Sequence, residues 1–182
     1  FFAPFVGMLF FIPGGVGGII NASNQMNQVV HNTVWVTGHF HLTVATAVML
    51  TFFGIAYWLI PTLTGRKLTA KANKWGIIQT WFWTIGMAIM SGAMHWQGLL
   101  GGPRRSAFSE YAGNADTSWG AYQIAQAVGG SILFIGMLIM IGIFIYLAFF
   151  APKGEEEFPV ATTAETASET PAVLENWKLW IG

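Results

Sequence analysis

The chain contains no cysteine and few charged residues. Without cysteine it can form no disulfide, thiolate metal site or iron–sulfur cluster of its own. Only 9% of the 182 residues are charged, against about 25% in a typical soluble domain. The net charge is zero and no basic stripe runs along the sequence, which argues against nucleic acid as a partner. Any transition metal would have to be bound by histidine, carboxylate or methionine.

What the sequence has instead is apolar length: 54% of its residues are hydrophobic. A helix needs about 20 mostly apolar residues to cross a hydrocarbon core of about 30 Å. Four stretches reach that length, so we expect an all-α integral membrane protein whose surface contacts lipid or partner protein. The predicted bundle covers residues 1–150, with helices at about 1–20, 32–60, 75–100 and 121–150.

The segments between and after these helices predict an orientation. The loop at 64–74 carries four basic and no acidic residues, which places it on the cytoplasmic side. The connector at 101–120 then faces outward. An Ala-, Thr- and Glu-rich segment, 151–176, has the composition of a flexible polar linker. Residues 177–182, with two tryptophans and a lysine, resemble the interfacial start of a further helix.

The first residue, Phe1, lies inside an apolar run and follows no charged leader. A secretory signal peptide has a positively charged segment and a cleavage site, and neither is found here. We therefore expect the chain to be part of a longer polypeptide, truncated at the front and also at the back.

Two histidines, His39 and His41, lie within the second hydrophobic stretch. Ionisable residues at membrane depth are rare and by default indicate function. Residues i and i+2 point about 200° apart on a helix, so the two imidazoles cannot share one metal ion. They can instead bind two metals on opposite sides of one helix, and haem iron takes axial histidine. The alternative is a pair of hydrogen bonds to neighbouring helices; the pattern favours metal binding.

Arg104 and Arg105 follow Pro103 in the outward connector. Arginine binds carboxylates through a planar pair of donors, and haem carries two propionates. His39 lies about 10 Å below the outer end of its helix, at about 1.5 Å per residue. A haem bound there could extend its propionates toward the arginines, and His31 and Asn32 are placed to hydrogen-bond the same groups. The alternative is that the arginines bind lipid phosphate or partner carboxylates.

The remaining histidine, His95, comes near the outer end of the third helix. We favour a structural hydrogen bond for it over metal binding. A stripe of methionines on the same helix is more typical of packing than of a site.

Two segments resemble subunit I of the haem–copper oxidases. The stretch Val30-His31-Asn32-Thr33-Val34-Trp35-Val36-Thr37-Gly38-His39-Phe40-His41-Leu42 is similar to helix ten of that subunit. The stretch His95-Trp96-Gln97-Gly98-Leu99-Leu100-Gly101-Gly102-Pro103-Arg104-Arg105 is similar to the end of helix eleven and the next connector. The sequence around both motifs is most similar to the B family of these oxidases. The resemblance implies part of a fold with twelve or more transmembrane helices.

The resemblance also implies roles for individual residues. His39 would bind the iron of the high-spin haem, where dioxygen binds opposite copper, and His41 the iron of the low-spin haem. Arg104 and Arg105 would pair with haem propionates, and His31 and Asn32 would join that hydrogen-bonded region. The expected cofactors are therefore two haems and a copper ion.

Other parts of the family's site have no match in this sequence. The copper ligands, the cross-linked tyrosine and the second low-spin ligand would lie upstream of Phe1, so the fragment alone would be inactive. The complete enzyme would reduce dioxygen to water, coupled to proton translocation, with electrons from cytochrome c. Its partners would be the rest of subunit I, subunit II with the electron-entry site, cytochrome c and lipid of a prokaryotic plasma membrane. The alternatives are a quinol oxidase or nitric oxide reductase of the same superfamily, or a non-catalytic membrane subunit.

Overall fold

The structure is a computed structural model that describes residues 2–106, 116–155, 173 and 176–181. Its elements, in chain order, are α1 (Phe2–Ala22), α2 (Asn24–Val30), α3 (Val34–Leu42), the π-helix η1 (Thr43–Val48), α4 (Met49–Leu63), α5 (Ala70–Leu99), α6 (Trp119–Ile145), the π-helix η3 (Tyr146–Phe150) and α7 (Trp177–Ile181).

Among the described residues, four helical spans are long and apolar enough to cross a membrane, which confirms the predicted fold class. They are α1, the continuous run from α3 through η1 to α4, α5, and α6 with η3. The α3–α4 run and α5 contain 30 residues each, or about 45 Å at about 1.5 Å per residue, which exceeds the hydrocarbon thickness. Their ends therefore reach the polar interfaces.

Two boundaries differ from the sequence prediction. The second helix was predicted to end at about residue 60, whereas α4 continues through Pro61. The proline is buried in the last turn, where only two more residues follow before the helix ends at Leu63. The third helix begins earlier than expected, because the side chain of Thr69 accepts a hydrogen bond from the backbone N–H of Ala72 and caps the first turn.

As a result, Lys71 and Lys74 belong to the first turns of α5 and not to the preceding loop. The structure describes only part of the outward connector and of the C-terminal segment. Residues 107–115 of the outward connector and most of the 151–176 linker lie outside the described residues. The short helix α7 covers most of the segment 177–182.

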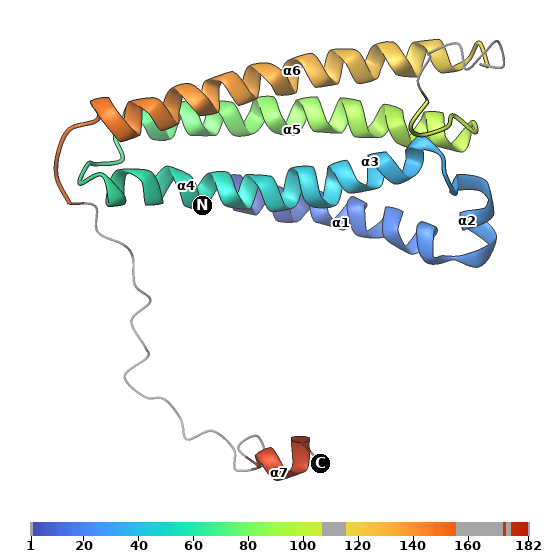
Figure 1. The fold of residues 1–182 in the computed structure, drawn as a ribbon, viewed down its shortest axis with the longest axis horizontal. Helices are drawn as coiled ribbons and strands as arrows, with labels where there is room; N and C mark the ends of the chain where they lie inside the picture. The colour runs from blue at the N-terminus through green and yellow to red at the C-terminus, as the bar shows by residue number, and fades with distance from the viewer. Residues whose placement is uncertain (1, 107–115, 156–172, 174–175, 182) are drawn as a thin grey trace.

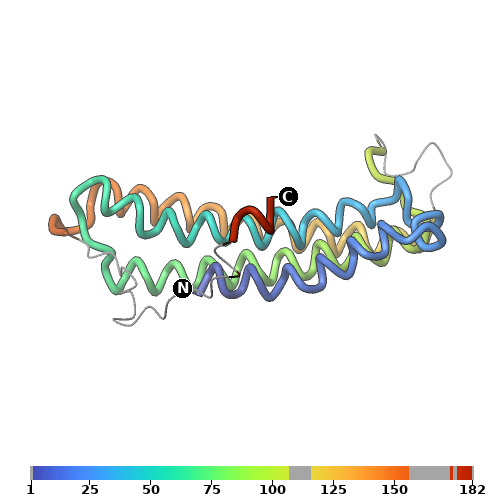
Figure 2. The backbone as a smooth tube through the Cα atoms, turned by 90° about the horizontal axis from the view of Figure 1, so that it is seen from below, coloured from blue at the N-terminus to red at the C-terminus, as the bar shows by residue number. Residues whose placement is uncertain are grey.

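The spans form an elongated bundle in which α5 and α6 lie side by side and α1 runs along the α3–α4 helix (Figures 1 and 2). One end of the bundle holds α2, the start of α3 and the end of α5; the other holds the end of α4, the start of α5 and the end of α6 (Figure 1). We call these the outer and inner ends, following the predicted orientation.

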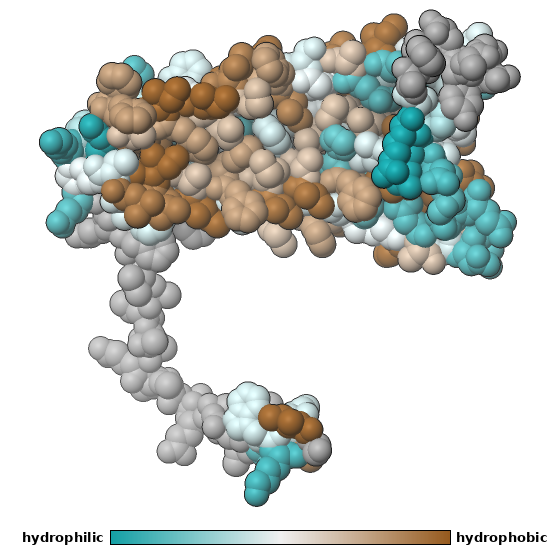
Figure 3. Space-filling model, in the orientation of Figure 1, coloured by the Kyte–Doolittle hydropathy of each residue, from teal (hydrophilic) through white to brown (hydrophobic). Residues whose placement is uncertain are grey.

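The core joins three helices. Leu50 and Phe53 of α4 pack with Trp83 and Met87 of α5, and α1 adds two small residues. Glycine lets α5 and α6 approach closely: a Cβ on Gly86 would lie 2.7 Å from a backbone oxygen of α6. The apolar residues left on the outside form a belt across the visible face, with polar residues at both ends (Figure 3). This distribution fits a protein whose middle is in hydrocarbon.

Candidate functional site

At the outer end, the first turn of α3 is bonded to the connector that carries both arginines. Thr33 and Pro103 pair in an isolated antiparallel bridge. The backbone N–H of Arg104 donates to the carbonyl of Asn32 at 3.1 Å, and the Arg104 guanidinium donates to the Asn32 side-chain oxygen at 3.0 Å. Two of the four residues predicted around the propionates therefore contact each other directly.

The other two are nearby but differently held. Arg105 is exposed and has φ +62°, a left-handed conformation that a non-glycine residue adopts at a cost of about 1–2 kcal/mol. Asn32 has φ +58°, which asparagine tolerates better than most residues. His31 is exposed, and its backbone N–H donates to the carbonyl of Asn27 at 2.8 Å. Within the described residues, no carboxylate pairs with either arginine.

Close contact between α3 and α5 fixes this end. A Cβ on Gly98 would collide with the backbone of Trp35, and a Cβ on Gly38 would lie 2.7 Å from the His95 ring. Because each glycine lets a residue of the other helix approach closely, the connector after α5 is brought onto the start of α3. Tertiary packing therefore gathers residues 31–32 and 104–105.

His39 lies seven residues below Asn32 on α3 and points toward α1. Its Nδ1 is 2.8 Å from the carbonyl oxygen of Gly14. Gly17 and Gly18 border the same ring, since Cβ atoms built on them would lie 3.4 and 3.2 Å from it. The glycine-rich middle of α1 therefore gives the imidazole room, and one of its carbonyls orients the ring.

His41 makes a similar bond within its own helix. Its Nδ1 is 2.7 Å from the carbonyl oxygen of Thr37, one turn earlier. It does not share an acceptor with His39, as expected for residues about 200° apart on a helix.

These contacts determine which nitrogen of each ring carries the proton. A carbonyl oxygen only accepts, so Nδ1 of each neutral imidazole must be the donor, which leaves the lone pair on Nε2. Metal-bound histidine almost always donates its other N–H to such a partner, which fixes the tautomer and the ring orientation. Each ring therefore keeps its Nε2 lone pair available to a metal, and histidine nitrogen is a ligand that haem iron takes.

The helix changes geometry directly after the histidines. Residues 43–48 form the π-helix η1, and π-turns occur frequently at functional sites. The Thr46 hydroxyl donates to the carbonyl of His41 at 2.6 Å, and the Thr43 hydroxyl to that of His39 at 3.2 Å. The Ala45 carbonyl accepts from the indole of Trp83 at 2.8 Å, which ties this segment to α5. Both histidine carbonyls thus keep a partner where the regular helix ends.

His95 has the hydrogen bond predicted for it. Its Nδ1 lies 2.7 Å from the carbonyl of Ser91, and the Ser91 hydroxyl donates to the Gly38 carbonyl at 2.9 Å. Its ring meets Trp35 edge to face with centroids 4.5 Å apart. His95 therefore joins α5 to α3 at the level of the histidine pair.

A groove of about 320 Å³ opens beside these residues, bordered by α1, α3 and α5. It is lined by Pro13, Val16, Gly17, Ile20, Trp35, Leu42, His95, Trp96 and Leu99, a set without His39 or His41. The indole N–H of Trp35 is buried and has no acceptor among the described residues. It is thus an available donor at the same end as the arginines.

Sequence reasoning missed two groups that position the histidines. Gly14 positions His39 through its backbone carbonyl alone. Ser91 positions His95 through its carbonyl, and nothing in the sequence distinguishes it from other residues of the helix. A signal for the first was present in the glycine-rich middle of the first apolar run, a composition that allows a neighbouring helix to approach.

The comparison with protein families agrees with this arrangement. Residues 1–132 match the family described as cytochrome c and quinol oxidase polypeptide I. The chain belongs to this family. It is accordingly part of a haem–copper oxidase subunit I, and membership implies haem and copper in general.

Individual members of the oxidase family give the extent of the similarity. A cytochrome c oxidase subunit 1 of Thermus thermophilus is 44% identical over 148 residues, which cover 81% of this chain and 26% of the relative. A second Thermus thermophilus protein of that name is 52% identical over 98 residues, covering 54% of this chain and 91% of the relative. A probable quinol oxidase subunit 1 of Staphylococcus aureus is 30% identical over 97% of this chain and 28% of its own length.

The fold of the family is also matched by a solved structure. A haem–copper terminal oxidase dimer studied by electron cryo-microscopy superposes with a TM-score of 0.80 and 35% identity, over 98% of this chain and 31% of that one. The chain therefore spans about a quarter to a third of these longer oxidases. Four apolar spans and bacterial oxidase relatives identify it as a multi-pass protein of the plasma membrane.

Proposed function

We propose that this chain is the part of a terminal oxidase's catalytic subunit that holds both haems. His39 binds the high-spin haem iron and His41 the low-spin haem iron. The observation that carries this proposal is the pair of Nδ1 contacts to the carbonyls of Gly14 and Thr37. Because each carbonyl retains the proton on Nδ1, both Nε2 atoms present lone pairs from one helix.

The outer end supports the same assignment. Arg104 and Arg105 bind haem propionates, and His31 and Asn32 belong to that polar region. The bond from Arg104 to Asn32 leaves guanidinium donors for a carboxylate, and no described carboxylate competes for them. Arginine–carboxylate bonds are among the stronger hydrogen bonds, and the adjoining positive charges would stabilise the ionised propionates.

When bound, haem supplies a redox-active iron for electron transfer and dioxygen chemistry. The residues of this chain hold the groups in place. The Gly14 carbonyl fixes the orientation of His39, and the contact between α3 and α5 fixes the arginines relative to that helix. The rigid helix carrying both histidines sets the separation of the two iron ligands.

We propose further that the complete protein is a cytochrome c oxidase, which reduces dioxygen to water coupled to proton translocation. The identity with two Thermus proteins of that name supports this reaction. Copper would be bound by residues of the rest of subunit I, and electrons would enter from cytochrome c through subunit II.

The assignment of the two irons is tested by difference spectroscopy on the complete complex. His39→Ala should remove the haem that binds carbon monoxide, and His41→Ala should alter the low-spin haem band while a carbon-monoxide-binding haem remains. Reduced-minus-oxidised spectra with and without carbon monoxide measure both effects. His95→Gln is the matched control, since its role is to join helices, and it should keep both bands.

Retention of both haem bands and of oxygen uptake in both alanine variants would make the histidines structural. Loss of both haems in every variant, the control included, would show only disrupted assembly. Measuring haem content and complex yield alongside the spectra separates these outcomes.

A quinol oxidase is the second candidate, because the Staphylococcus aureus relative named as one matches 97% of the chain. The two enzymes differ in the electron donor that they oxidise. Oxygen uptake by the purified complex with reduced cytochrome c, and not with a reduced quinol, is the expected result. Uptake with quinol alone would replace the cytochrome c assignment and would leave the haem ligands unchanged.

A further inference from the structure

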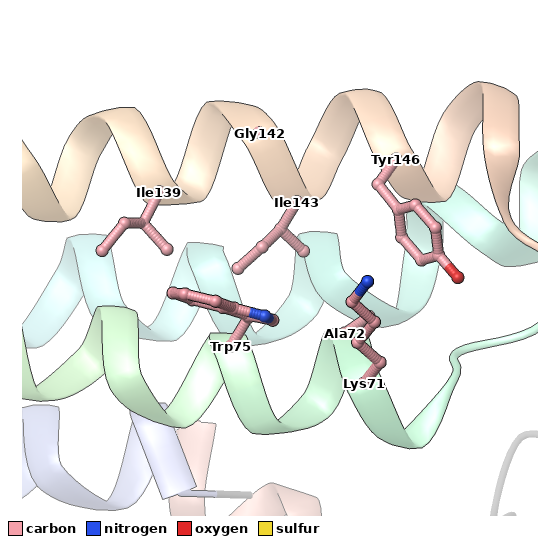
Figure 4. A pocket seen from close by; sticks show the side chains of 7 residues that line it. All are labelled: Lys71, Ala72, Trp75, Ile139, Gly142, Ile143 and Tyr146. Carbon is pink, nitrogen blue, oxygen red and sulfur yellow. The ribbon is translucent and has the colours of Figure 1, made fainter.

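A pocket unrelated to the histidines lies at the inner end, between the start of α5 and the end of α6. It has a volume of about 280 Å³ and is lined by Lys71, Ala72, Trp75, Ile139, Gly142, Ile143 and Tyr146. The Lys71 ammonium and the Tyr146 hydroxyl lie at one end of it, and Trp75, Ile139 and Ile143 line the other (Figure 4). The pocket is thus polar at one end and apolar along the rest.

That polarity is aligned with the membrane. Along α6, Ile139 and Ile143 precede Tyr146, which begins the last turn, so the apolar end points toward the bundle's middle and the polar end toward the interface. Trp75 is 44% exposed and lies one turn after Lys71 on α5, and tryptophan is enriched near membrane interfaces. An occupant would need a polar head at the inner surface and an apolar body in the hydrocarbon.

The charge at the polar end favours an anion. Lys71 belongs to the first turn of α5, a 30-residue helix whose N-terminus carries partial positive charge. Four more basic residues, Arg66, Lys67, Lys74 and Lys153, lie at the same end of the bundle. The backbones of Arg66 and Lys153 form an isolated antiparallel β-bridge. The Arg66 guanidinium donates a hydrogen bond to the Ala151 carbonyl. Among the described residues at this end the acidic side chain is Glu155, and it makes no ion pair with Lys71.

From this arrangement we propose that the pocket binds an anionic phospholipid of the inner leaflet. The Lys71 ammonium and the Tyr146 hydroxyl bind the phosphate, and an acyl chain lies along Trp75, Ile139 and Ile143. The lysine stem can cover apolar surface while its charge stays at the interface. A zwitterionic head group also has a phosphate, but its own cation offsets that charge, so the lysine and the helix N-terminus favour a head group with a net negative charge.

Lipid selectivity of the complete, purified complex tests the site. Spin-labelled phosphatidylglycerol and phosphatidylcholine are compared by electron paramagnetic resonance in the wild type and in Lys71→Gln. A lysine near the surface contributes about 1 kcal/mol, so the preference for phosphatidylglycerol at this site should fall about fivefold. Lys153→Gln is the matched control: it removes the same charge at the same end from a residue that does not line the pocket.

An equal loss of preference in the two variants would show general surface attraction and overturn the proposal. No loss in either variant would overturn it as well. The proposal is supported if the preference for phosphatidylglycerol falls clearly in Lys71→Gln and changes little in Lys153→Gln.

A second measurement locates the lipid without relying on substitution. Phosphatidylglycerol with a photoactivatable acyl chain should attach to the peptides containing Trp75 and residues 139–143. Attachment only elsewhere on α6, or protein cross-links in place of lipid at Ile139→Cys, would show that another part of the assembly covers this face. Oxygen uptake and haem spectra should be unchanged in Lys71→Gln, so failure of this proposal and failure of the haem assignment remain distinguishable.

Discussion

The two ends of the bundle use basic residues differently. At the outer end, Arg104 is bonded through backbone and side chain to Asn32, and helices α3 and α5 meet at glycine. At the inner end, Lys71 and Lys74 are exposed on flexible stems at the start of α5. A rigid group suits a cofactor held in one geometry, whereas a flexible one suits a mobile lipid. The two ends carry the same charge in different settings, so position and partners, not charge alone, decide which ligand each end could bind.

The largest effect should come from breaking the helix contact at the outer end. Gly98→Ala places a Cβ against the backbone of Trp35, which cannot move without shifting α3. Overpacking of this kind costs about 1–3 kcal/mol. We expect a lower thermal inactivation midpoint and reduced haem content in the purified complex.

Gly92→Ala on the same helix is the control, since nothing lies within 4 Å of the added Cβ. Its thermal inactivation midpoint should equal that of the wild type or be slightly higher, because alanine favours the helix. Equal behaviour of the two variants would mean that the α3–α5 contact does not organise this end.

A smaller effect should follow from changing the residue that holds Arg104. Asn32→Ala removes the acceptor of the guanidinium and places alanine at φ +58°. A lost hydrogen bond costs about 0.5–1.5 kcal/mol, and the left-handed conformation adds about 1 kcal/mol. Asn32→Gly loses the acceptor and keeps the conformation, so its destabilisation should be about half as large. Thermal inactivation of the complex measures both, and a larger loss in the glycine variant would contradict the explanation.

The smallest effect should be at the inner end. Arg66→Ala removes a donor to the Ala151 carbonyl, while the backbone bond from Lys67 to the Pro152 carbonyl remains. A loss of about 1 kcal/mol or less is expected, with haem spectra unchanged. Hydrogen exchange at residues 64–69 should increase locally. A change in the haem bands would show that the two ends of the bundle are coupled.

Much of the fold could be predicted from composition and length. Four apolar stretches gave four spans, because lipid requires every spanning backbone to satisfy its hydrogen bonds internally. Boundaries were less predictable. The second helix was expected to end at about residue 60, but it includes Pro61, because a proline can occupy a last turn. Lys71 and Lys74 were expected in the loop, but Thr69 caps α5 ahead of them.

The candidate site divides in the same way. The His39–His41 spacing predicted two ligands on different sides of a helix, because helical geometry alone sets that angle. Their orientation was not predictable, since the acceptor of His39 is a carbonyl of Gly14, 25 residues away. The glycines of the first apolar run indicate that a neighbouring helix approaches closely, but not which carbonyl accepts the proton of His39.

The sequence by itself determined that this protein is a membrane bundle with two histidines on one helix and two arginines in a connector. Local periodicity and apolar length carry that information. The tertiary structure decided that Asn32 meets Arg104, that Gly14 orients His39 and that Lys71 faces Tyr146 across a pocket. These contacts join residues distant in the chain, and they exist only once glycine-lined helices pack closely enough to bring them together.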